Sequence, residues 1–188
     1  SLPPQCEVIG ARTLLVTAHR RESFGEPLKE LCLALRDIAE RFHDILLIYP
    51  VHLNPNVQEP VRAILGQCDR IRLIDPLGYA DFVALLSRTY LILTDSGGIQ
   101  EEAPAIGKPV LVLREKTERP EGIEAGVVKL VGTSRSRIVE EASRLLSDQT
   151  AYAAMAREVN VYGDGLAAKR ITEVLLEGRM ISPPFVST

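Results

Sequence analysis

The stretch YLILTDSGGIQEE, Tyr90 to Glu102, decides the fold. It begins with an uninterrupted apolar run, passes through two consecutive glycines and continues into residues that favour a helix. An uninterrupted apolar run predicts a strand buried on both faces, because a strand with one face in water would alternate apolar and polar residues. A buried strand that leads directly into a helix is the building unit of parallel sheets covered by helices.

The same unit recurs along the whole chain, because short apolar runs alternate with amphipathic stretches. The expected strands are 13–17, 45–49, 71–74, 90–94, 110–113 and 127–131, and the expected helices are 28–42, 57–65, 79–86, 99–106, 138–146, 151–159 and 166–176. Six alternations of strand and helix predict an α/β layered sandwich with a mainly parallel six-stranded sheet.

Composition and charge exclude several classes of protein. The 188 residues include 22 basic and 25 acidic side chains, and 46% are apolar, which is typical of one folded domain and excludes a disordered or collagen-like chain. A net charge of −3 provides no overall positive field for a nucleic acid or a membrane surface, so any phosphate must be bound at a local site. No apolar stretch is long enough to span a bilayer, and the residues Ser1 to Pro4 do not resemble a signal peptide, so we expect a cytoplasmic protein without a membrane partner.

The reactive side chains give no sign of a metal or disulfide framework. Cys6, Cys32 and Cys68 are widely spaced and odd in number, so we expect reduced and mostly buried thiols. No pair of histidines has the spacing of metal ligands, and we expect neither a metal site nor a cofactor. The sequence does not begin with Met, which suggests a piece of a longer protein.

Ligands of parallel sheets bind at the carboxyl ends of the strands, so the residues directly after each strand are the candidates for a site. Ser96, Gly97 and Gly98 follow the fourth strand. The glycines lack the Cβ atoms that would keep a phosphate from the backbone, and the first helix amides carry a partial positive charge. These residues favour a diphosphate site, with a simple tight connection as the alternative. Neither GxGxxG nor GxxxxGK[ST] occurs in the chain.

Two carboxylates, Glu101 and Glu102, lie in the first turn of the following helix. A carboxylate there stabilises the helix dipole with or without a ligand, but it can also accept hydrogen bonds from both hydroxyls of a ribose. Only one of the two can face the same way as Gly98, and their spacing does not decide which.

Cationic residues follow the first strand, at His19, Arg20 and Arg21. An imidazole at this place can donate to a phosphate oxygen or to a leaving group. The alternative is that the two arginines are solvated and paired with Glu22.

Two further residues have both a structural and a functional interpretation. Arg119 lies in a charged loop after the fifth strand, which is either a solvated surface or, with the backbone restricted by Pro120, a site for bidentate contacts to a sugar or phosphate. Phe82 fits a core position by its pattern, and stacking on a nucleobase is the alternative.

The motifs TAHRRE (17–22), DPLGY (75–79) with Phe82, TDSGGIQEEA (94–103) and TERPEG (117–122), followed by residues 160–168, resemble in this order the non-hydrolysing UDP-N-acetylglucosamine 2-epimerases. The likeness covers essentially the whole chain but only the C-terminal half of that family. Its members have a two-domain GT-B architecture, in which a Rossmann-like C-terminal domain holds most of the uridine nucleotide and the active site lies between the domains.

The resemblance implies that residues 1–188 are the UDP-binding Rossmann-like domain, that the N-terminal domain with the acidic catalytic residues is absent, and that the helix at 166–178 crosses to it. It further implies the following sites: Ser96, Gly97 and Gly98 for the diphosphate, Glu102 for the ribose, Phe82 with the backbone of Leu77 for the uracil, Arg119, Arg20 and His19 for the phosphates and sugar, and His19 as the catalytic group that stabilises the departing diphosphate.

The implied reaction converts UDP-GlcNAc to UDP-ManNAc by elimination and readdition of UDP. The resemblance implies that the full-length enzyme is a homodimer and that this half alone is inactive. Three other functions are alternatives. The donor-binding half of a GT-B glycosyltransferase shares the fold but not the TERPEG and His19 segments, and a hydrolysing epimerase is a close relative. A flavodoxin-like binding module is the non-enzymatic alternative.

Overall fold

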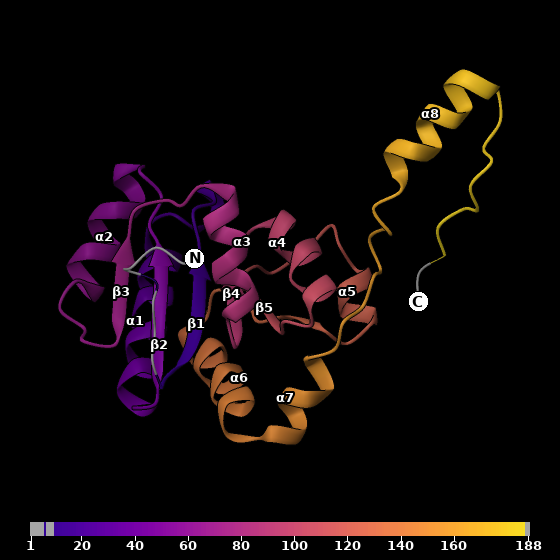
Figure 1. Ribbon diagram of the computed structural model, residues 1–188. Coiled ribbons are helices and arrows are strands. Elements are labelled where there is room, and N and C mark those ends of the chain that lie inside the picture. Colours follow the sequence, from indigo (N-terminus) through magenta and orange to yellow (C-terminus); the bar gives the residue numbers. More distant parts are fainter. Residues whose placement is uncertain (1–5, 7–9, 187–188) are drawn as a thin grey trace.

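The predicted strands form one parallel sheet in the computed structural model, which describes residue 6 and residues 10–186 (Figure 1). Ser1 to Pro4, which were predicted not to form a signal peptide, lie outside the described residues. The strands are β1 (Arg12–Thr17), β2 (Ile45–Pro50), β3 (Ile71–Ile74), β4 (Leu91–Thr94), β5 (Val110–Val112) and β6 (Val128–Leu130). The sheet order is β3-β2-β1-β4-β5-β6 and each of these neighbouring pairs is parallel, which confirms the predicted α/β class and Rossmann-like topology.

The order of the strands reverses between β1 and β4. The chain builds one half of the sheet outward from β1 to β3, returns to place β4 beside β1, and then builds the other half. Thr17 pairs with Thr94 at the ends of these two strands, and their hydroxyl oxygens are 2.6 Å apart. Residues 18–20 and 95–97 therefore start side by side, at the place where α/β sheets bind their ligands.

Helices cover both faces of the sheet (Figure 1). They are α1 (Glu26–Arg41), α2 (Pro55–Leu65), α3 (Tyr79–Arg88), α4 (Gly97–Glu102), α5 (Glu121–Glu124), α6 (Arg135–Ser147), α7 (Gln149–Met155) and α8 (Ala167–Glu177), with short 3-10 turns η2 (Arg21–Ser23) and η3 (Pro104–Ile106). Leu14 and Val16 pack into a first core cluster with α1, α2 and α6, whereas Leu15 packs into a second core cluster with α3 and α4. Burial on both faces explains why the strand sequences are continuously apolar.

Two helix predictions were wrong in their bounds, and one helix was missed. The helix expected over 99–106 is α4 followed by the separate turn η3, because Pro104 has no N–H with which to continue the α-helical ladder. The helix expected over 151–159 is α7, which ends at Met155. The helix α5 was not predicted, since its four residues are too short to show a helical period.

The cysteines are free thiols, as expected, with Cys6 and Cys32 buried and Cys68 half-buried. Burial raises the pKa of the Cys32 thiol to about 12, so this group stays protonated and packs as an apolar side chain. No helix among residue 6 and residues 10–186 is long and apolar enough to cross a membrane.

The helix α8 forms at the predicted place but packs on no core. None of its residues is buried, and it extends away from the sheet (Figure 1). Its apolar residues are largely in solvent, with Leu175 78% and Leu176 77% exposed. Exposed apolar residues gathered on one helix are typical of an interaction surface.

The buried Tyr49 fixes the end of β1, because its hydroxyl donates to the carbonyl oxygen of Ala18 at 2.7 Å. We expect Tyr49→Phe to lower the free energy of unfolding by about 1 to 3 kcal/mol, since a buried carbonyl loses its partner. Urea unfolding of this variant and of Tyr79→Phe, whose parent side chain is 71% exposed, provides the measurement and its control. Equal stability of the two variants would contradict the assignment.

Candidate functional site

The turn between β4 and α4 has an open helix start. Ser96 occupies the position before α4 with an extended backbone (φ −80°, ψ 133°), and its N–H donates to the Thr94 hydroxyl at 2.9 Å. The side chain of Ser96 makes no capping hydrogen bond. The predicted diphosphate residues therefore lie together at the start of a helix, directly beyond the strand end.

Gly97 lies against the guanidinium of Arg119. A Cβ atom at this position would be 2.9 Å from both Cζ and Nη1 of Arg119, closer than carbon atoms approach without a shift. The backbone of Gly97 therefore brings a cation to the turn, 22 residues before Arg119 in the sequence. A side chain at this position would therefore displace the guanidinium of Arg119 from the turn.

Glu101 and Glu102 are the last two residues of α4 and not part of its first turn, as was predicted, because the helix already begins at Gly97. Their carboxylates point in different directions. The Nε–H of Arg119 donates to Glu101 in a short ion pair, and Nη1 of Arg119 is 3.8 Å from Glu118. A Cβ atom built on Gly98 would instead find Oε1 of Glu102 at 3.9 Å. Glu102 is therefore the carboxylate on the Gly98 side, which answers the question that the spacing left open.

A chain of hydrogen bonds holds the TERPEG loop against α4. The side chain of Gln100 is completely buried, and its Nε2 donates to the carbonyl of Ser96 at 3.1 Å. Its Oε1 accepts from the Thr117 hydroxyl at 2.6 Å, and the same hydroxyl accepts from the backbone N–H of Arg119 at 3.2 Å. The positions of the turn and of the arginine thus depend on one buried amide.

Arg114 anchors the other side of this loop. Its side chain is buried, donates to Glu22 at 2.8 Å, and makes two hydrogen bonds to Glu118 at 3.0 and 3.1 Å. The alternative that Glu22 pairs with Arg20 and Arg21 is wrong in this respect, because its carboxylate contacts Arg114, which follows β5. Hydrogen bonding from Arg114 lowers the pKa of Glu118 to about 2.

His19 and Arg20 meet the turn through Asp95. The backbone N–H groups of both residues donate to Oδ2 of Asp95, each at 2.8 Å. The His19 ring is 43% exposed, its Nδ1 is 3.7 Å from Oδ1 of Asp95, and it stacks on His52 with centroids 5.4 Å apart. The structure therefore brings the loop after β1 directly against the residue that precedes Ser96.

The predicted uracil residues belong to another element. Phe82 lies in α3 and Leu77 just before it, and both are half-buried against the second core cluster, which also includes Ile99 of α4. These contacts agree with the prediction that Phe82 is a core residue. Leu77 and Phe82 therefore lie on the same face of the sheet as α4.

Tyr162 connects the segment before α8 to the TERPEG loop. Its hydroxyl accepts from the N–H of Gly122 at 3.0 Å and donates to the carbonyl of Arg119 at 3.4 Å. A Cβ atom at Gly122 would lie 2.9 Å from this hydroxyl, so the close contact requires the glycine.

Sequence reasoning assigned no role to Asp95, Gln100 or Tyr162, although all three lie within motifs that it quoted. The sequence around them gave no local signal of burial, because Asp95 lies between Thr94 and Ser96, and Gln100 is followed by Glu101 and Glu102. Such residues are buried only with hydrogen-bond partners, but the partners come from distant segments.

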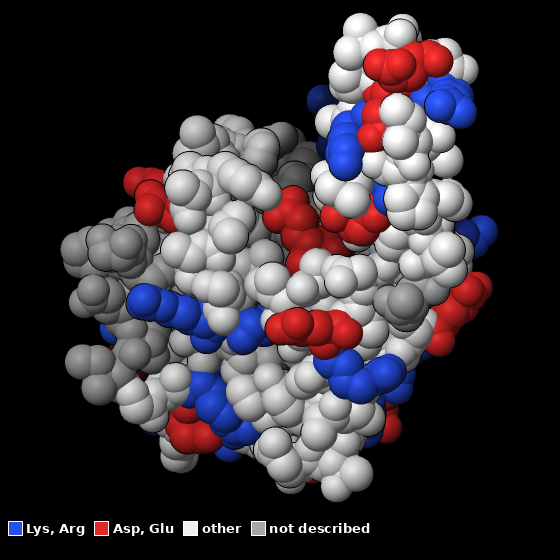
Figure 2. Space-filling model, turned by 45° about the vertical axis from the view of Figure 1, so that its right-hand side comes forward, with Lys and Arg blue, Asp and Glu red and all other residues white. Residues whose placement is uncertain are grey.

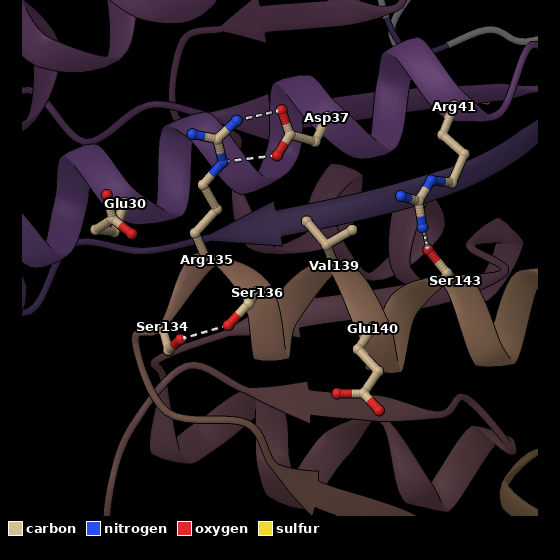
Figure 3. Close-up of a pocket in the computed structure, with 9 residues that line it drawn as sticks. All are labelled: Glu30, Asp37, Arg41, Ser134, Arg135, Ser136, Val139, Glu140 and Ser143. Carbon is tan, nitrogen blue, oxygen red and sulfur yellow. Dashed lines mark hydrogen bonds and ion pairs between the residues drawn. The ribbon is translucent and has the colours of Figure 1, made fainter.

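Two cavities border these elements without containing the predicted site residues. One of about 430 Å³ is lined by residues after β1 and β5, including Glu22, Arg114 and Glu118. The other, of about 750 Å³, is a groove between α1 and α6 in which Arg135 binds Asp37 through two hydrogen bonds of 2.6 and 2.7 Å (Figure 3). Hydrogen bonding from Arg135 lowers the pKa of Asp37.

The surface charges are mixed rather than separated. On the face that Figure 2 shows, Lys and Arg lie between Asp and Glu, and the described residues form no continuous basic area there. This face therefore shows no broad positive patch, in agreement with the net charge of −3.

A parallel sheet with strand order 3-2-1-4-5-6 defines a Rossmann-like fold, and a glycine turn and an arginine lie at its switch point, where such sheets bind their ligands. Residues 5–176 match the family model described as UDP-N-acetylglucosamine 2-epimerase. The chain belongs to this family, which confirms the resemblance found in the motifs.

Similar proteins cover this chain almost completely. The UDP-N-acetylglucosamine 2-epimerase of Escherichia coli (strain K12) is 59% identical over 90% of the chain and 45% of its own length. The epimerase of Neisseria meningitidis bound to UDP-GlcNAc is 46% identical with a TM-score of 0.87, covering 89% of the chain and 45% of that structure. An S. aureus MnaA–UDP co-structure is 45% identical with a TM-score of 0.87, covering 93% and 48%. The chain thus spans about half the length of the relatives that it matches.

The pairing of Glu118 with Arg114 predicts a pH dependence of stability. The pKa of Glu118 is lowered from 4.5 to about 2, so its ionised form stabilises the fold fully above pH 4.5, and this contribution is lost as the pH falls toward 2. We expect Glu118→Gln to reduce the slope of unfolding free energy against pH in this window, measured by urea unfolding.

The control for this prediction removes the partner. In an Arg114→Met background the largest cause of the lowered pKa is gone, although a backbone hydrogen bond and Arg20 still lower it, so a further Glu118→Gln substitution should change the slope much less. An equal effect of Glu118→Gln in both backgrounds would show that Arg114 is not the cause.

Proposed function

We propose that this chain is the UDP-binding half of a two-domain UDP-N-acetylglucosamine 2-epimerase. The observation that carries the proposal is the guanidinium of Arg119 held against Gly97 at the switch point of the sheet. A diphosphate needs such a cation together with backbone that a Cβ atom does not shield. Two similar proteins, described as bound to UDP-GlcNAc and as a UDP co-structure, support the identity of the ligand.

The proposed nucleotide site follows the arrangement at the carboxyl edge of the sheet. The diphosphate lies at Ser96, Gly97 and Gly98. The Glu102 carboxylate, on the Gly98 side, accepts hydrogen bonds from the ribose hydroxyls. The uracil lies against Phe82 and the backbone of Leu77. Arg119, His19 and Arg20 face the phosphates and the sugar.

The proposed reaction inverts the sugar at C2. A base removes the proton from C2, the bond from C1 to the diphosphate oxygen breaks, and the products are UDP and a 2-acetamidoglucal. UDP then adds back to C1 while a proton is delivered to the other face of C2. In this scheme the present chain retains UDP and stabilises the charge on the departing diphosphate through His19. The acidic residues that exchange the proton at C2 belong to the other domain.

The helix α8 supports a second domain in the whole protein. It has no buried residue, its leucines are exposed, and the relatives are about twice as long as this chain. We propose that residues 166–178 cross to the N-terminal domain and cover their apolar face there. On the resemblance alone, we also propose that the whole protein is a cytoplasmic homodimer.

The contact of α8 can be tested with Leu175→Asp. In a protein that includes the preceding domain, this change should lower the unfolding temperature, because it places a charge in an apolar contact. In the 188-residue chain alone it should leave the unfolding temperature unchanged, since Leu175 is 78% exposed. Equal effects in both proteins would exclude the domain contact.

UDP binding tests the nucleotide site directly. Titration calorimetry of the folded chain with millimolar UDP should give a saturable binding heat, and no heat would contradict the proposal. We expect Glu102→Ala to weaken binding by about 5- to 150-fold, which corresponds to about 1 to 3 kcal/mol for a lost charge-assisted hydrogen bond. Glu140→Ala, which makes the same charge change in the groove between α1 and α6, is the matched control.

A product assay of the whole protein separates the possible enzymes. UDP-ManNAc as the product, with little free UDP, is expected for the proposed epimerase. Accumulating UDP with ManNAc would identify a hydrolysing epimerase, and sugar transfer to an acceptor would identify a glycosyltransferase. Epimerised product from the 188-residue chain alone would contradict the requirement for a second domain.

A further inference from the structure

Asp95 has one carboxylate oxygen that its backbone role does not use. The side chain is completely buried, and Oδ2 accepts the two N–H groups of His19 and Arg20. The other oxygen, Oδ1, has no hydrogen-bond partner, and among the described residues it is the one buried side-chain atom in this condition. A buried polar atom without a partner costs free energy, so this oxygen calls for a functional explanation.

The group that Oδ1 faces is the imidazole of His19. Its Nδ1 is 3.7 Å away, slightly beyond hydrogen-bond distance, and the ring is 43% exposed on its other side. The second titratable group against His19 is the imidazole of His52, from the loop after β2, which lies parallel to it with 10° between the planes. Stacking restricts the ring to a plane, and Asp95 then selects which nitrogen faces inward.

We propose that Asp95 is a positioning residue that holds His19 in the tautomer with the proton on Nδ1. A carboxylate accepts hydrogen bonds and cannot donate them, so the nitrogen that faces it carries a proton in both charge states of the ring. Nε2 is then the nitrogen presented to a ligand. The inference rests on the proposed function for its purpose, since the ligand of Nε2 is the diphosphate.

This arrangement suits the departure of a diphosphate. With the ring protonated, the Nε2–H donates to a phosphate oxygen as negative charge develops on it, while Asp95 stabilises the imidazolium from behind. If Nε2 transfers its proton to that oxygen, the ring is left neutral with its remaining proton on Nδ1, still toward Oδ1. Such hydrogen bonds are often long in the free protein and shorten when the ligand is bound.

Asp95→Asn separates positioning from backbone support. The single oxygen of an asparagine can still accept the N–H groups of His19 and Arg20, so the loop after β1 keeps its hydrogen bonds. The amide NH₂ then takes the place of Oδ1 and donates toward Nδ1, which must accept. The variant therefore reverses the preferred tautomer of His19 without removing the contacts that hold the loop.

The test is long-range ¹H–¹⁵N NMR of the histidine rings in the ligand-free 188-residue chain at about pH 9, where histidine side chains are neutral in general. The chain has three histidines, so substitution of His43 and His52 one at a time assigns the signals. We expect the wild-type His19 to be protonated on Nδ1 and the Asp95→Asn variant to be protonated on Nε2. Asp44→Asn removes a carboxylate at the amino ends of the strands, far from His19 at their carboxyl ends, and should leave the tautomer unchanged.

A wild-type His19 protonated on Nε2 would overturn the proposal, even if the variant fails to fold. An unchanged tautomer in folded Asp95→Asn would overturn it as well. The measurement needs no UDP, so failure of UDP binding would overturn the proposed function and leave this result intact. In the whole protein, the variant should lower kcat more than it raises KM, and a change in KM alone would contradict positioning of a group that acts in the transition state.

Discussion

The candidate site depends on the hydrogen bonds that the Asp95 carboxylate accepts from the backbone of His19 and Arg20. The position of this carboxylate directly after β4 allows it to accept hydrogen bonds from the residues directly after β1, although 76 residues separate Asp95 from His19 in the sequence. The strands on either side of this junction lead outward in opposite directions, so no helix crosses the edge here to cover it. A buried charge joins the two halves of the sheet where a ligand needs both.

The second support of the site is the tie between α4 and the TERPEG loop. Gln100 is buried and satisfied on both sides, with Ser96 on one and Thr117 on the other. Arg119 is thereby fixed against Gly97, and Glu101 neutralises it in the free protein. Under the proposed function, an incoming phosphate would meet a cation that is already in place and would compete with Glu101 for the guanidinium.

The sequence predicted the positions of the six strands well, because burial on both faces of the sheet leaves continuous apolar runs. It also predicted a candidate site in the residues after β1, β4 and β5, and the structure brings these segments together through Asp95 and Arg119. Spacing did not separate Glu101 from Glu102, because neighbouring helix residues differ only in direction, and that difference became visible through Arg119 and Gly98. Asp95 and Gln100 were missed because the partners that make them important come from distant segments.

Tyr162 connects the segment before α8 to the loop that carries Arg119. The segment that leads out to α8 is fastened by one hydroxyl to the backbone on both sides of Pro120, at Arg119 and Gly122. When another body holds α8, the angle between that body and the sheet is transmitted through a short tether to the loop that carries the guanidinium. Under the proposed function, a displacement of α8 would therefore reach the backbone of Arg119 through the hydroxyl of Tyr162.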